Sequence, residues 1–341
     1  GKETYEFESR LKKLTKSPFV VLVSNGSVAL DLSLKLLKCK KEDEILLPSF
    51  NYIAAANAIL NNYAVPHFIE INNQLTIDTV KLEHYLKKNT KIINRKCINI
   101  KTGRTISAVI CLHTFGHSCD IDRLKKISKK FRLYLIEDAA ESLGTYYKKI
   151  HTGTVGDVGI LSFNGNKILT TGSGGALLLK KKKLADEAKR MINHYKKDHS
   201  WKFIHSSKGF NYKFSNINAA LGLSQLKKIK EIISLKRNLF SVYNKKFKKY
   251  NEFGVILKEP KFSKSNYWLQ TLILKKKSYK HLFLKKLHQK KIFCREAWTP
   301  MHKLNYLRKF PKMNLNKTND MYSKVINLPS GLDIAKLNEK K

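Results

Sequence analysis

The chain has 341 residues, of which 42% are hydrophobic, and this composition is typical of a globular protein rather than a disordered one. No apolar run approaches the ~20 residues that span a bilayer, and no signal-peptide segment opens the chain. Against 26 acidic residues stand 67 lysines and arginines, which give a formal charge of +41 and suggest nucleic-acid binding as one function class.

The positive charge has a second explanation in compositional bias. Basic residues are scattered along the chain, with short runs at 180–183, 275–277 and 285–286. No nucleic-acid-binding motif accompanies these runs, so we do not expect a nucleic-acid partner. A positive field would instead favour an anionic small substrate.

The five cysteines indicate a reducing compartment. They form no CxxC pair, so neither a disulfide framework nor a metal site is expected, and a cytoplasmic location fits best.

Apolar runs alternate with helical patterns through the first half of the chain. Strands are predicted at 19–23, 44–47, 67–71, 107–113, 133–137, 158–163 and 175–179. Helices are predicted at 28–37, at 51–60 and from an N-cap at Asp120 to Lys130. This alternation predicts an α/β fold with a mostly parallel sheet that is covered on both faces.

The pattern changes after Lys180. Helices are predicted at about 184–196, 217–249 and 279–290, with a strand at 271–274. We expect a large domain over 1–215, followed over 216–341 by a long helix and a smaller α/β domain.

Three short polar stretches follow or precede these elements. EDAAESLG (137–144) places Asp138 just after a strand, where parallel sheets bind ligands. SFNGNKILTTGSGG (162–175) places Lys167 between a strand and a glycine-rich turn. SNGS (24–27) precedes a helix, whose free N–H groups favour an anion. Taken singly, Asp138 could equally be a helix cap and SNGS an ordinary N-cap, while a single lysine is nearly always a solvated surface residue.

Together the three stretches suggest pyridoxal phosphate (PLP). This cofactor needs a lysine amine for a Schiff base, an acid that faces the pyridine nitrogen and a cradle for its phosphate. Lys167, Asp138 and the Asn25-Gly26-Ser27 turn could supply these parts.

From end to end, the chain resembles the DegT-type sugar-nucleotide aminotransferases. The motifs that carry the resemblance are SNGSVAL (24–30), PSFNYIAAANAI (48–59), EDAAESLG (137–144), SFNGNKILTTGSGG (162–175) and GFNYKFSNINAALGLSQL (209–226). The resemblance implies a three-layer PLP-transferase fold of the aspartate aminotransferase type, with a smaller C-terminal α/β domain. It also implies a homodimer whose active sites are shared between the subunits.

The resemblance assigns roles to individual residues. It makes Lys167 the Schiff-base lysine and Asp138 the partner of the pyridine nitrogen. It places Gly26, Ser27 and Ser162 at the cofactor phosphate, Tyr52 stacked on the ring, Glu141 on the ring-oxygen side, and Asn211 at the phosphate of the neighbouring subunit.

A finer resemblance concerns the substrate. EDAAESLG, SFNGNKILTTG, WKFIH (201–205), NYWLQ (266–270) and CREAWTPMHKL (294–304) are similar to enzymes that aminate C4 of UDP-linked 4-keto-6-deoxy-N-acetylhexosamines with glutamate, for legionaminic acid and N-acetylbacillosamine. Perosamine synthases, which use a GDP sugar, share two of these motifs. Arg295 and His302 could contact the nucleotide diphosphate or the sugar, or could be ordinary surface residues.

The sequence also departs from the family pattern. Lys213 replaces the usual arginine, Glu296 the usual proline and Ser173 the usual glutamate or glycine. The resemblance implies a further N-terminal segment of a few dozen residues, so a chain opening at GKETYEFESRL is expected to be shortened. An inactive relative that binds the cofactor is therefore the alternative hypothesis.

Overall fold

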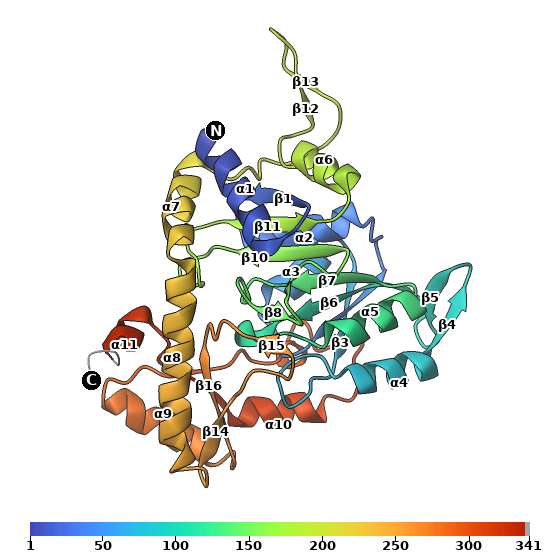
Figure 1. The fold of residues 1–341 in the computed structure, drawn as a ribbon. Coiled ribbons are helices and arrows are strands. Elements are labelled where there is room, and N and C mark those ends of the chain that lie inside the picture. The colour runs from blue at the N-terminus through green and yellow to red at the C-terminus, as the bar shows by residue number, and fades with distance from the viewer. Residues whose placement is uncertain (338–341) are drawn as a thin grey trace.

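The computed structural model describes residues 1–337. Figure 1 shows a large sheet at one end and a smaller C-terminal region at the other, with the long helix α8 (Ile229–Lys248) running between them. The strands of the large sheet are β1 (Phe19–Val23), β2 (Glu44–Pro48), β3 (Val65–Ile69), β4 (Thr90–Ile93), β5 (Lys96–Asn99), β6 (Thr105–Leu112), β7 (Tyr134–Asp138), β10 (Val158–Ser162) and β11 (Gly175–Leu179).

The large sheet is mostly parallel, as predicted. Its main strand order is β1-β11-β10-β7-β6-β2-β3, and β10-β7, β7-β6, β6-β2 and β2-β3 pair in parallel. The strand β11 pairs antiparallel with both β10 and β1, and the β4–β5 hairpin joins β6 antiparallel. Because β6, β7 and β10 run in one direction, their carboxyl ends lie at the same edge of the sheet.

Helices cover both faces of this sheet. Those in the first half are α1 (Lys2–Thr15), α2 (Gly26–Leu36), α3 (Ala54–Asn61), α4 (Thr79–Asn89), α5 (Ile121–Lys130) and α6 (Lys182–Met191). Alternate side chains of β1 point to opposite faces of the sheet. Val21 and Val23 belong to the core that includes α2 and α6, whereas Val20 and Leu22 pack with Phe7 and Leu11 of α1. Asp120 caps α5 as predicted, its side chain accepting a hydrogen bond from Arg123 N.

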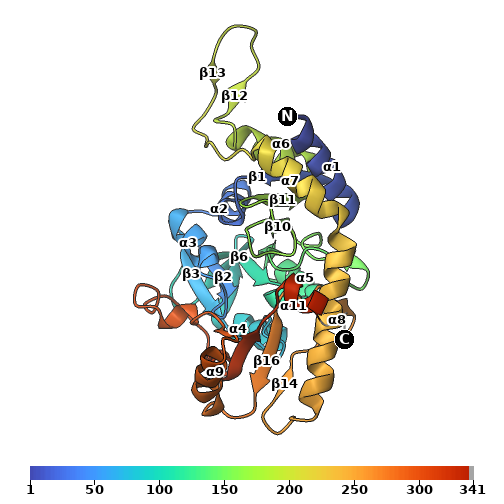
Figure 2. The same cartoon turned by 90° about the vertical axis from the view of Figure 1, so that its left-hand side faces the viewer.

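The helix predicted at 51–60 is α3, which begins at Ala54, and two other predicted helices differ more from the structure. The helix predicted at 217–249 is two helices, α7 (Asn216–Lys227) and α8, which meet at the non-helical residue Lys228. The helix predicted at 184–196 ends at Met191, because His194 and Tyr195 adopt positive φ angles of 53° and 50°. The chain then forms a hairpin of β12 (Lys196–Lys197) and β13 (Ile204–His205), which projects from the molecule in Figures 1 and 2.

The C-terminal region contains an antiparallel sheet. Its strand order is β14 (Gly254–Ile256), β16 (Gln270–Leu274), β18 (Val325–Leu328) and β17 (Arg295–Glu296). Its helices are α9 (Tyr279–Gln289), α10 (Asn316–Lys324) and α11 (Leu332–Leu337). The predicted helix at 279–290 and strand at 271–274 therefore have counterparts, while α1, α4, α10 and α11 were not predicted.

The C-terminal region also reaches back onto the large sheet. The short strand β15 (Ser263–Lys264) pairs with β8 (Tyr146–Tyr147), which in turn pairs with β9 (Ile150–His151). The 3-10 turn η2 (Met301–Lys303) begins at an N–H that donates to Ser49 O, 2.9 Å away. These contacts bring C-terminal side chains to the edge where β7 and β10 end.

Candidate active site

A cavity of about 320 Å³ lies where β7 and β10 end and α2 begins. It collects residues that are far apart in the sequence. Its lining comprises Asn25, Gly26, Ser27, Leu30, Asn51, Tyr52, Ala54, Ala55, Leu112, Asp138, Ala140, Glu141, Ser162, Asn164, Asn166, Lys167, Trp268 and Trp298. Most of the predicted site residues are thus brought together.

Lys167 lies in the turn that follows β10. Its Nζ is 3.7 Å from Glu141 Oε1 and 4.0 Å from the centroid of the Trp268 ring, and its side chain is only 14% exposed. The glycine turn behind it is sterically required. At Gly174, where φ is +156°, an added Cβ would lie 2.3 Å from a ring carbon of Phe214. The fold therefore holds this lysine inside the cavity, unlike a solvated surface lysine.

Asp138 is the last residue of β7 and is buried. Burial raises the pKa of its carboxyl above the ordinary value, and the hydrogen bond from Ala140 N (3.1 Å) and the charge of Lys167 oppose that rise. A cationic group that entered the cavity would further favour the ionised carboxylate.

A buried charge network that sequence analysis did not identify supports the strand that carries Asp138. Glu137 Oε2 lies 3.1 Å from His113 Nε2, and the Glu137 carboxylate also accepts from the N–H groups of Gly153, Val155 and Gly156. Burial acts to raise the pKa of Glu137, but these hydrogen bonds, led by that of His113, lower it overall. The network anchors β7 to the loop that precedes β10.

Glu141 lies beside the lysine. Burial raises the pKa of its carboxyl to about 7, although the nearby Lys167 and the hydrogen bond from Phe115 N (2.8 Å) act in the opposite direction. This acid therefore changes charge near neutral pH and can exchange a proton with groups in the cavity.

The first turn of α2 forms a concave, electropositive cradle. Asn25 caps the helix by accepting from Val28 N at 2.9 Å, and the first turn contains no acidic residue. A Cβ added to Gly26 would lie 2.9 Å from Ser162 Cβ, so only glycine allows this close approach of α2 to β10. Free N–H groups at a helix start, with the hydroxyls of Ser27 and Ser162, suit a phosphate.

An aromatic wall and one polar side chain complete the cavity. Tyr52 is 55% exposed and its ring centroid lies 6.4 Å from that of Trp298, while Trp268 Nε1 donates to Asn166 O at 2.7 Å. Asn51 is 1% exposed, and neither its Oδ1 nor its Nδ2 has a hydrogen-bond partner among the described residues. Buried amides are normally paired, so Asn51 is free to bond a ligand.

Three predicted site residues lie elsewhere in this chain. Arg295 is exposed in β17 and lines a different cavity, with His281 and His288. The Nδ1 of His302 lies 2.7 Å from Ser49 Oγ, and His302 does not line the cavity of Lys167. Asn211 is exposed and pairs with Asn193 in an isolated β-bridge.

Trp268, Trp298 and Asn51 were not singled out from the sequence. Each stands inside a motif that had been quoted for the resemblance, NYWLQ, CREAWTPMHKL and PSFNYIAAANAI. Their presence in these motifs was the signal that could have identified them. Whether such a side chain points into the cavity, however, depends on tertiary contacts.

The donor set of the cavity fits PLP. An amine, a buried carboxylate facing the same space, a glycine-lined cradle that a Cβ would fill, and an unpartnered buried amide together match a cofactor that carries an aldehyde, a basic ring and a phosphate. No group of three or more metal-ligating side chains occurs within residues 1–337. None of the helices in that range is long and apolar enough to cross a lipid bilayer.

Glu141→Gln should stabilise the ligand-free protein at alkaline pH. The pKa of Glu141 is raised from 4.5 to about 7, so its contribution to stability is complete below pH 4.5 and is lost as the pH rises through 7. The glutamine variant should exceed the wild type in free energy of unfolding by up to ~3 kcal/mol at pH 8, with no difference near pH 4.5. Denaturant titrations across this range measure the difference, with the exposed Glu42→Gln as control. A pH-independent difference would contradict the assignment.

Known proteins are similar to this chain over most of its length. The model of the DegT/DnrJ/EryC1/StrS aminotransferase family matches residues 1–339. GDP-perosamine synthase of Escherichia coli O157:H7 is 31% identical over 332 residues, covering 97% of this chain and 85% of the relative. A Campylobacter jejuni UDP-4-amino-4,6-dideoxy-N-acetyl-β-L-altrosamine transaminase is 29% identical, with coverages of 96% and 85%.

Solved structures share the fold. The Helicobacter pylori aminotransferase PseC, involved in pseudoaminic acid biosynthesis, superposes with a TM-score of 0.87 at 24% identity, covering 100% of this chain and 91% of that one. The PLP form of the putative sugar aminotransferase Spr1654 of Streptococcus pneumoniae gives a TM-score of 0.85 at 21% identity, with the same coverages. The chain therefore belongs to the DegT/DnrJ/EryC1/StrS aminotransferase family and is a PLP-dependent aminotransferase.

Proposed function

We propose that this enzyme transfers the amino group of L-glutamate to C4 of a nucleotide-linked 4-keto-6-deoxy sugar, as a step in the biosynthesis of a cell-surface glycan. The first candidate substrate is UDP-2-acetamido-2,6-dideoxyhexos-4-ulose. The observation that carries the proposal is the meeting of Lys167, Asp138 and the α2 cradle in one cavity beneath an aromatic wall.

The residues of the cavity divide the work of transamination. When bound, PLP supplies an electron-withdrawing ring that makes the C–H bond of the amine-bearing carbon acidic. Lys167 Nζ would remove that proton and deliver it to the cofactor, and the Asp138 carboxylate would keep the ring nitrogen protonated. Gly26, Ser27 and Ser162 would hold the phosphate, and Glu141 would fix the position of the Lys167 amine.

The outer part of the cavity suits a sugar. Tyr52, Trp268 and Trp298 present aromatic surface on which the apolar face of a hexose can pack, and Asn51 offers a donor and an acceptor to its hydroxyl or acetamido group. Polar groups placed in this way set the orientation of a small-molecule ligand.

The second candidate substrate is a GDP-linked 4-keto-6-deoxyhexose. It is favoured by the relatives named GDP-perosamine synthase from Escherichia coli, Vibrio cholerae and Caulobacter vibrioides, which are 30–31% identical to this chain. Both candidates require the same chemistry at C4 and differ in the base and in the substituent at C2.

We further propose that the enzyme works as a homodimer in which Asn211 reaches the cofactor phosphate of the partner. In support, Asn211 is exposed close to the start of α2, since the O of its neighbour Tyr212 accepts from Ser24 N at 3.0 Å. Several large apolar side chains nearby are exposed, among them Trp201, Phe203 and Ile217. A subunit contact would bury this apolar surface.

The test supplies each keto sugar separately to the PLP-loaded enzyme, with glutamate that carries a heavy-nitrogen label. We expect mass spectrometry to show labelled nitrogen in the UDP-linked N-acetyl sugar. Labelled nitrogen only in the GDP sugar would establish the second candidate instead. If glutamate converts the bound cofactor but neither sugar is aminated, the proposed substrate class is wrong although the enzyme is a transaminase.

A further inference from the structure

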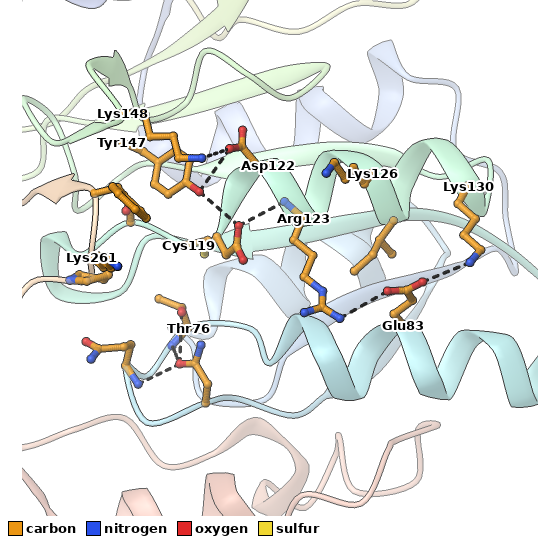
Figure 3. Close-up of a pocket in the computed structure, with 17 residues that line it drawn as sticks. Thr76, Glu83, Cys119, Asp122, Arg123, Lys126, Lys130, Tyr147, Lys148 and Lys261 are labelled. Atoms are coloured by element: carbon orange, nitrogen blue, oxygen red, sulfur yellow. Dashed lines mark hydrogen bonds and ion pairs between the residues drawn. The ribbon is translucent and has the colours of Figure 1, made fainter.

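A second cavity, larger than that of Lys167, lies on the α5 side of the large sheet. It has a volume of about 740 Å³ and is formed by the segment that follows β3, by α4, by α5 and the residues before it, by the β8–β9 turn and by residues 260–262 (Figure 3). The two cavities share no lining residue. The second cavity is therefore separate from the cavity of Lys167.

The lining of this cavity is strongly cationic. Arg123, Lys126 and Lys130 come from α5, Lys148 from the β8–β9 turn and Lys261 from the segment before β15, and they outnumber the carboxylates in the described lining. Neither Lys126 nor Lys261 forms an ion pair with any carboxylate of residues 1–337. These two amines are available to an anion.

The carboxylates around the cavity already have partners. Glu83 is shared by Lys130 (3.1 Å), Arg123 (3.5 Å) and Lys87 (3.3 Å). Asp122 pairs with Lys148 at 2.6 Å, and Asp120 caps α5. One carboxylate cannot neutralise three cations, so the positive potential persists on the Arg123 side of the cavity.

Buried polar groups without partners also line the cavity. Ser118 is 1% exposed, and its Oγ has no hydrogen-bond partner among the described residues. The Gln74 Oε1 atom is also buried and also has no hydrogen-bond partner among those residues. Gln74 Oε1 can only accept a hydrogen bond, whereas Ser118 can donate or accept one. Such groups are normally satisfied, so they point to a ligand that carries hydroxyl groups.

We propose that this cavity binds a small phosphate ester of a hydroxylated molecule, that is, a sugar phosphate or a nucleotide. Lys126, Lys261 and Arg123 meet the phosphate, and Ser118 and Gln74 meet the hydroxyls. The Phe262 ring, 62% exposed and flanked by Lys261 Nζ at 5.1 Å and Lys148 Nζ at 5.4 Å, offers a flat surface to a sugar or base.

The chain connects this second site to the transamination cavity. Leu112 lines the cavity of Lys167, Phe115 N donates to Glu141, and Ser118 lines the second cavity. The 3-10 turn η1 (Thr114–Gly116) lies between them. A ligand held at Ser118 therefore contacts the segment that positions Glu141.

The test is isothermal titration calorimetry of the PLP-saturated enzyme, in which the phosphate cradle of α2 is filled, at about 0.15 M salt to screen the general positive field. The probes are glucose 1-phosphate and uridine monophosphate, with glucose and uridine as unphosphorylated controls. We expect saturable binding of at least one phosphate ester and of neither control. The probe that binds identifies the ligand as a sugar phosphate or a nucleotide.

Matched charge reversals locate the binding. Lys126→Glu with Lys261→Glu should weaken it by roughly tenfold or more, because two charge-assisted contacts are lost. Lys125→Glu with Lys129→Glu changes the net charge equally. Both residues lie on α5, as Lys126 does, but outside the cavity lining, so this pair should weaken binding less than about twofold. Ser118→Ala, which removes no charge, should weaken binding by roughly threefold.

Three results would overturn the proposal. The first is no saturable binding of either phosphate ester. The second is equal weakening in both charge-reversed pairs, which would mean attraction by the overall charge of the protein. The third is binding that survives the reversal of Lys126 and Lys261, which would place it outside this cavity.

Discussion

Lys167→Ala is expected to lower kcat by at least ~10⁴-fold, because the variant lacks the amine that we propose bonds the cofactor and moves the substrate proton. The fold should survive, since Lys167 lies in a turn. Within residues 1–337 its Nζ contacts Glu141 at 3.7 Å and the Trp268 ring, and neither contact joins two elements of the core. Steady-state turnover with glutamate and the keto sugar measures the loss, and the visible absorption band of bound cofactor reports the missing bond.

Two further measurements distinguish the loss of the reactive amine from the loss of the positive charge of Lys167. Lys167→Arg keeps a cation beside Glu141 but should be as inactive as the alanine variant, because a guanidinium does not give up its proton at neutral pH. A small exogenous amine should restore part of the activity of Lys167→Ala. An alanine variant that retained a tenth of wild-type turnover without added amine would remove Lys167 from the catalytic role.

Asp138→Asn is expected to lower kcat by ~10²–10⁴-fold while leaving the cofactor bound. The substitution keeps the size of the side chain, and the amide oxygen can still accept from Ala140 N, so β7 should end as in the wild type. In the role proposed for Asp138, its carboxylate would keep the ring nitrogen protonated. An amide cannot do this, so the bound ring would withdraw electrons less strongly.

The matched control is Asp157→Asn. Asp157 Oδ2 accepts from Leu135 N at 2.9 Å near the other end of β7, and it does not line the cavity. We expect this variant to keep wild-type turnover. If both variants lost activity equally, strand stability would explain the effect of Asp138→Asn.

Local sequence patterns predicted most of the large sheet and most residues of the candidate active site. Apolar runs such as FVVLV and GALLL become β1 and β11 because strands buried on both faces need continuous hydrophobic residues. Asp138, Ser162 and Lys167 lie within a few residues of such runs. Once the strands are parallel, their carboxyl ends meet, so the sequence order already implies that these side chains converge.

The break at Lys228 was not predictable in the same way. No proline interrupts the helical periodicity between Asn216 and Lys248. Sequence patterns were likewise insufficient to predict whether Arg295 and His302 line the cavity. Both residues stand in the motif that also contains Trp298, yet only Trp298 lines the cavity, because β17 pairs with β18 and His302 bonds Ser49.

The sequence by itself determined the family of this protein, its cofactor and the parallel order of the strands that carry Asp138 and Ser162, because those depend on short motifs and on local hydrophobic periodicity. Only the tertiary structure decided that Trp268 and Trp298 form the wall of the active site, that Glu141 is buried against Lys167, and that cations from α5 face Lys261 across a second cavity. The aromatic wall and the second cavity join residues that are more than a hundred positions apart, and the pKa of Glu141 depends on its burial. Contacts at such sequence distances, and burial, arise from the packing of the C-terminal region on the large sheet.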